Sequence, residues 1–136
     1  MKRYSFLENT ADIKIRATGK NNEESFTNCA YALKEAITRG KRIEEKIQKD
    51  LFFDCKNKEE LLYKFLEEFI YLLEAENFIL SKVKELKING NKLNAKVSGD
   101  STLNYKINNE VKAITYSEIL VKEEKGKFIC EVVFDV

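Results

Sequence analysis

The chain has 136 residues, of which 43% are hydrophobic and 35% charged, and its formal net charge is +1. That length and composition predict a single globular domain over residues 1–136 with a buried core. A nearly neutral charge argues against direct nucleic-acid binding, which usually requires a clear basic excess.

The first third of the chain predicts a strand followed by a helix. Residues 11–17 alternate between polar and apolar side chains, which is typical of a half-buried strand. After a turn at residues 19–22, a helix is expected to continue to about Arg39, with Asn21 or Asn22 as its N-cap and Gly40 just beyond its end. One face of this helix is apolar: Phe26, Cys29, Ala30, Leu33 and Ile37.

The middle of the chain carries the strongest helical signal. A short strand is expected over Lys49–Asp54, and Asn57 then begins a capping box with Glu60. The helix it opens should extend to about Ala75. Its wide apolar face is typical of core packing: Leu61, Leu62, Phe65, Leu66, Phe69, Ile70 and Leu73.

The remainder of the chain predicts antiparallel strands. Ile79–Asn89 and Lys92–Ser98 flank Asn89-Gly90, a strong signal for a two-residue hairpin turn. A second pair is expected over Val111–Val121 and Lys127–Val136. Because two helices cannot cover both faces of about six strands, we expect an α+β fold. It would be a two-layer sandwich with both main helices on one face of a largely antiparallel sheet.

Several residue types and patterns are missing. The chain contains no histidine, so Ser-His and Cys-His nucleophile pairs are excluded, and it has no glycine-rich nucleotide motif. We therefore predict no catalytic site of its own. Three widely spaced cysteines, Cys29, Cys55 and Cys130, fit neither a disulfide framework nor a zinc site. With no signal peptide or membrane-spanning apolar run, they favour a cytoplasmic protein.

Four polar segments could carry chemistry, and each has an ordinary structural explanation. Residues 8–12, which end in Asp12, suit a turn into a strand. At the other end, Asp135 precedes Val136, and the two negative charges expected there would be relieved by a bound cation or simply hydrated. Gly99-Asp100 suits a turn, and residues 110–117 suit a strand with a polar stripe that includes Lys112.

Taken in order, these segments resemble the archease family. The resemblance rests on Glu8-Asn9-Thr10-Ala11-Asp12, Gly19, Glu60-Leu61-Leu62, Gly99-Asp100, Val111-Lys112-Ala113-Ile114-Thr115-Tyr116 and Phe134-Asp135-Val136. Archeases are small accessory proteins of the GTP-dependent RNA ligase that joins tRNA halves. The resemblance implies an activator that promotes guanylylation of this tRNA-splicing RNA ligase and restores its turnover.

The resemblance also implies a divalent-cation site. Carried over by position, its ligands would be Asp12, Asp135 and Val136, the last through its α-carboxylate or main chain. Such an all-oxygen donor set suits a hard cation, calcium above all.

The chain departs from the family pattern where Asn9 and Ser117 replace histidines and Asp100 replaces glutamate, so no role can depend on imidazole. Two alternatives remain open: an accessory factor for another tRNA-modifying enzyme such as a methyltransferase, and a small metal-dependent hydrolase using Asp12 and Asp135.

Overall fold

The computed structural model describes residues 3–8 and 11–136. Within these ranges the chain forms seven strands, two α-helices and one short 3-10 helix. In chain order these are β1 (Tyr4–Leu7), β2 (Ile13–Gly19), α1 (Asn22–Thr38), β3 (Ile47–Asp54), α2 (Lys58–Glu76), β4 (Phe78–Asn89), β5 (Lys92–Ser101), η1 (Thr102–Asn104), β6 (Ala113–Glu124) and β7 (Lys127–Asp135).

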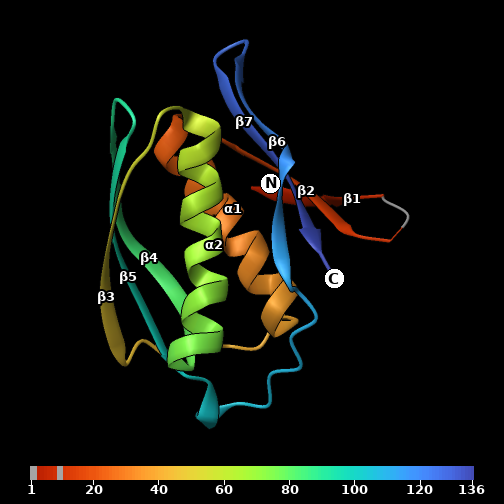
Figure 1. The fold of residues 1–136 in the computed structure, drawn as a ribbon, viewed down its shortest axis with the longest axis vertical. Coiled ribbons are helices and arrows are strands. Elements are labelled where there is room, and N and C mark those ends of the chain that lie inside the picture. Colours follow the sequence, from red (N-terminus) through yellow and green to blue (C-terminus); the bar gives the residue numbers. More distant parts are fainter. Residues whose placement is uncertain (1–2, 9–10) are drawn as a thin grey trace.

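The strands form two antiparallel sheets, with the helices between them (Figure 1). One sheet has the order β1-β2-β7-β6 and the other β3-β5-β4. Helix α1 packs against β2, β7 and β4, whereas α2 packs against β6, β4 and β3. The predicted α+β class, with two helices against antiparallel strands, is confirmed.

The expected single sheet is not what the chain forms. Two smaller sheets each bury one face against the shared helices, and exposed residues alternate with buried ones over the first six residues of β5, from Lys92 to Val97. Two helices thus suffice for seven strands, because each helix is covered on two sides. The architecture therefore has three layers instead of the predicted two.

Local capping explains where the helices begin and end. The side-chain oxygens of Asn21 and Asn57 each accept a hydrogen bond at 2.8 Å, from the backbone N–H of Glu24 and Glu60 respectively. Both helices end at a residue in the left-handed conformation, Arg39 for α1 and Asn77 for α2. The predicted cap at Asn57 is confirmed, and of the two candidates for α1 the structure selects Asn21.

The core lies where the helices meet the two sheets. Its largest fully buried side chains include Phe26 of α1, Phe65 of α2 and Phe134 of β7. Full burial of one such ring stabilises the fold by about 1.5–3 kcal/mol. Cys29 and Cys130 are also completely buried, as predicted from their apolar faces. No helix in the described part of the chain is long and apolar enough to cross a membrane.

One local prediction was wrong, and one strand was not predicted. Gly99 and Asp100 belong to β5, which continues to Ser101, and do not form a turn. The strand β1 was not predicted, because four residues are too few to show a periodic pattern. It forms through its antiparallel pairing with β2, in which Tyr4 lies opposite Ala17.

Candidate functional site

The pairing of β2 with β7 brings the two ends of the sequence together. Their antiparallel register extends from Gly19 opposite Phe128 to Ile13 opposite Phe134. Asp12 lies in a bend immediately before β2, and Asp135 is the last residue of β7. Continuing the register by one residue would place Asp12 opposite Asp135, close to the chain end marked C in Figure 1.

The pleat of the sheet determines which way these side chains would point. Directly opposite residues of an antiparallel pair project from the same face, with Cα atoms about 4.5–5.5 Å apart. Phe134 faces the core and is fully buried, whereas Asp135, the next residue, is exposed. Asp12 is half-buried. The register is therefore compatible with two carboxylates side by side on the outer face of the sheet.

The neighbouring strand β6 fixes the backbone of Asp135. Ala113 lies opposite Asp135 in the β6–β7 pairing. The backbone N–H of Lys112 donates a hydrogen bond of 2.7 Å to the carbonyl oxygen of Asp135. The Asp135 carboxylate is thus carried on a restrained strand end with a neighbouring strand on each side.

The basic residues nearest along β2 are already engaged. Arg16 Nε donates to Glu131 at 2.8 Å, and Lys14 Nζ lies 3.9 Å from the same carboxylate. Neither Asp12 nor Asp135 forms an ion pair with a residue that the structure describes. Two carboxylates without basic partners are a reasonable binding site for a cation.

The chemistry of the donors limits which ion could bind. The described ranges contain no cluster of three or more His, Cys, Asp or Glu side chains. An ion held by Asp12 and Asp135 would therefore need main-chain oxygens, such as those of the half-buried Val136, and water. Oxygen-only coordination with water suits calcium or magnesium, and the absence of nitrogen or sulfur donors disfavours zinc.

Asp100 has a different role from the one that its sequence position suggested. It is buried and accepts hydrogen bonds from the Tyr105 hydroxyl at 2.8 Å, from Asn104 Nδ2 at 3.2 Å and from the Ser101 backbone N–H at 2.8 Å. The Tyr105 hydroxyl is the main cause of a lowered Asp100 pKa. This carboxylate anchors the segment after β5 and is not available to a ligand.

The positions that depart from the family pattern lie in different settings. Asn9 is outside the described residues. Ser117 is exposed on β6, within the part of that strand where its pairing with β7 is interrupted between Thr115 and Leu120. The aromatic ring of Tyr116, next to Ser117, contacts Tyr63 of α2 edge to face, with the centroids 5.1 Å apart.

Comparison with known proteins gives one consistent result. Residues 4–136 match the Archease protein family (MTH1598/TM1083). The chain is 34% identical to the archease of Pyrococcus furiosus and 30% identical to that of Sulfolobus acidocaldarius, in both cases over the full length of both proteins.

Solved structures agree with this match. The solution structure of a Methanobacterium thermoautotrophicum protein superimposes with a TM-score of 0.86 at 28% identity, over all of both chains. The crystal structure of a Thermotoga maritima protein, described as an archease and possible chaperone, has the same fold. It superimposes with a TM-score of 0.68 at 22% identity, over 96% of this chain and 94% of that one.

Proposed function

Because this chain belongs to the archease family, we propose that it is a chaperone-like activator of the GTP-dependent tRNA-splicing RNA ligase. It would promote guanylylation of the ligase and allow multiple turnovers, without ligase or nucleotidyl-transfer activity of its own, in the cytoplasm. The observation that carries this proposal is the family match over residues 4–136. The absence of histidine and of glycine-rich nucleotide motifs from the sequence supports the accessory role.

The activator would use a bound divalent cation, most suitably calcium. We assign Asp12 and Asp135 as its side-chain ligands and Val136 as a ligand through its α-carboxylate or main-chain oxygen. The support is the β2–β7 register and the lack of described basic partners for either carboxylate. The ion would offset the repulsion between the two carboxylates, while the chain fixes their position through β2, β7 and β6.

The activator function is tested by reconstitution with the cognate RNA ligase. The rate of formation of the ligase–GMP adduct is measured with labelled GTP, and joining of tRNA halves is followed with RNA in large excess over ligase. We expect this protein to accelerate adduct formation and to raise the product beyond one equivalent per ligase. Unchanged guanylylation at saturating protein would remove the activator function and favour a different tRNA-modifying partner.

The metal site is tested by replacing its carboxylates with amides of the same shape. Wild type should unfold at a higher temperature in calcium, because an ion that binds only the folded state stabilises it by mass action, by about 2.7 kcal/mol at one hundred times its Kd. Asp12→Asn and Asp135→Asn should show no calcium-dependent shift and no stimulation of the ligase. Asp54→Asn, an exposed aspartate on β3, is the matched control and should respond as wild type does. An equal calcium shift in all four proteins would show that neither aspartate is a ligand.

A further inference from the structure

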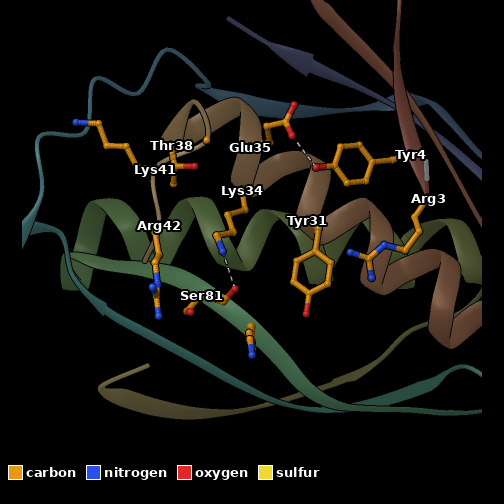
Figure 2. Close-up of a pocket in the computed structure, with 11 residues that line it drawn as sticks. Arg3, Tyr4, Tyr31, Lys34, Glu35, Thr38, Lys41, Arg42 and Ser81 are labelled. Carbon is orange, nitrogen blue, oxygen red and sulfur yellow. Dashed lines mark hydrogen bonds between the residues drawn. The ribbon is translucent and has the colours of Figure 1, made fainter. Parts of the chain in front are cut away.

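A basic cavity of about 510 Å³ lies between the start of β1, α1, the chain that follows α1, and β4 (Figure 2). Five basic side chains and one acidic side chain line it, although the net charge of the whole chain is only +1. The basic residues are Arg3, Lys34, Lys41, Arg42 and Lys82, and the acidic residue is Glu35.

The acidic residue forms no ion pair with these basic residues in the described part of the chain. Glu35 accepts a hydrogen bond of 2.7 Å from the Tyr4 hydroxyl, and Figure 2 shows the two side chains facing each other at one side of the cavity. Burial and this bond raise the pKa of Tyr4 to about 12, so the phenol stays a donor to Glu35 throughout the physiological range. Lys82 lies 3.6 Å from Glu45, but Arg3, Lys34 and Arg42 form no ion pair with any residue in the described ranges.

Lys34 is the basic residue most deeply placed in this cavity. Its side chain is half-buried, and Nζ donates one hydrogen bond of 2.8 Å, to the carbonyl oxygen of Ser81 (Figure 2). Burial first, and the charge of Lys82 second, lower the pKa of Lys34. An ammonium group has three donors, so Lys34 keeps two for a ligand, and a bound anion would offset both unfavourable effects.

The C-terminal end of α1 does not explain the whole cluster. Its carbonyl groups favour nearby cations, but the effect falls off within the last turn and therefore concerns mainly Lys41 and Arg42. The guanidinium group of Arg3 comes from outside that helix and lies 5.6 Å from the ring centroid of Tyr31. In Figure 2, Arg42 extends toward Ser81, whereas Lys41 points away.

The aromatic residues of the cavity do not form a platform for nucleic-acid bases. The Tyr31 ring carries Arg3 on one face, and its hydroxyl oxygen accepts a hydrogen bond of 3.1 Å from the Val83 backbone N–H. Tyr4 is bonded to Glu35. Proteins that bind single strands combine an extended basic groove with open rings for stacking, and this cavity offers one compact basic site instead.

We propose that the basic cavity binds a compact polyanion, namely a small ligand with two or more linked phosphate groups. Its volume lies within the range of about 300–1,000 Å³ that is common for small-molecule sites. Arginine and lysine donors are the usual partners of phosphate oxygens. The site is separate from the carboxylates of the proposed metal site: the Arg3 carbonyl accepts from Thr18, and Thr18 lies about 20 Å along β2 from Asp12.

The test is calorimetric titration of the full chain with inorganic tripolyphosphate in metal-free buffer, since tripolyphosphate also chelates calcium. Wild type should bind at a single saturable site, and sulfate should bind much more weakly. Lys34→Met, which removes the ammonium group and keeps most of the side-chain length, should raise the Kd by at least about tenfold. Lys106→Met, at an exposed lysine outside the cavity, is the matched control and should leave the Kd unchanged. Arg42→Met provides a second loss-of-binding variant if Lys34→Met does not fold.

Two further titrations identify the ligand class. ATP without magnesium should bind about as tightly as tripolyphosphate if linked phosphates are what the cavity recognises. Tighter, Lys34-dependent binding of a single-stranded RNA of about twelve nucleotides, or of polyglutamate, would overturn the proposal in favour of RNA or of an acidic protein segment. Equal Kd values in Lys34→Met, Arg42→Met and Lys106→Met would also overturn it. Asp12→Asn should bind tripolyphosphate as wild type does, so failure here and failure of the activator function are distinguishable.

Discussion

Replacing Gly99 with alanine adds only one methyl group, but it should destabilise the fold strongly. Gly99 lies on the central strand β5, opposite Ile47 of β3 and Leu80 of β4. A Cβ atom at this position would lie 2.1 Å from the carbonyl oxygen of Ile79 and 2.6 Å from the ring of Phe78. Neither neighbour can move without disturbing the β4–β5 pairing, because one is backbone and the other is a buried ring.

Overpacking of this kind typically costs about 1–3 kcal/mol, and a clash with backbone places Gly99→Ala at the upper end, about 3 kcal/mol. For a chain of this size such a loss should lower Tm by about 10 °C. The matched control is Gly40→Ala: Gly40 has a φ of +84°, but a Cβ there would meet nothing within 4 Å. Gly40→Ala should therefore lower the stability only through the unfavourable positive φ, by about 1 kcal/mol. Urea unfolding of both variants gives the comparison. Equal losses of stability would refute the steric explanation for Gly99.

Two further predictions concern titration and thiol reactivity. The Tyr105 hydroxyl lowers the folded-state pKa of Asp100 below its unfolded value of about 3.9, so this carboxylate's stabilisation is present above that pH and is lost as the pH falls through the folded-state pKa. Tyr105→Phe should therefore show a smaller drop in urea midpoint between neutral and acidic pH, and an unchanged drop would contradict this. In the folded protein iodoacetamide should alkylate only the half-buried Cys55. The rate should increase with pH, because the thiolate is the nucleophile, and the increase should lie at higher pH than for a free thiol, because burial and Glu60 raise the pKa of Cys55. Cys29 and Cys130 should react only after denaturation, and mass spectrometry showing equal labelling of all three would be inconsistent with their burial.

The parts of the fold that follow from local signals were predictable from the sequence. Asn57 caps α2 through a hydrogen bond that spans three residues, and Gly90 takes the positive φ that the two-residue turn between β4 and β5 requires. The division into two sheets was not predictable in this way. It depends on which distant strands pair: β2 joins β7 and β3 joins β5, and neither pairing leaves a local pattern in the sequence.

The candidate metal site shows the same limit. Asp12 and Asp135 each look like a solvated residue at a strand end, and 123 positions separate them in the sequence. Only the resemblance to a family connected them, and the β2–β7 register is compatible with Asp12 lying opposite Asp135. The sequence was misleading in a different way at Asp100. A Gly-Asp pair is typical of a turn, but Asp100 is buried within β5. Its carboxylate accepts a hydrogen bond from the hydroxyl of Tyr105, which lies beyond η1 in the sequence.

The basic cavity illustrates that the net charge of a chain does not predict whether folding creates a locally basic binding site. Lysine and arginine are spread along the whole sequence, and their near balance with acidic residues argues against a nucleic-acid interface. That balance constrains the sum of the charges and not their positions: folding gathers Arg3, Lys34, Arg42 and Lys82 at one cavity, while Asp12 and Asp135 lie toward the other end of β2. Each group has an excess of one sign that a bound ion of the opposite sign would relieve. A cation at the carboxylates and a polyanion in the cavity are therefore compatible with each other, and each would stabilise the folded chain by its own mass action.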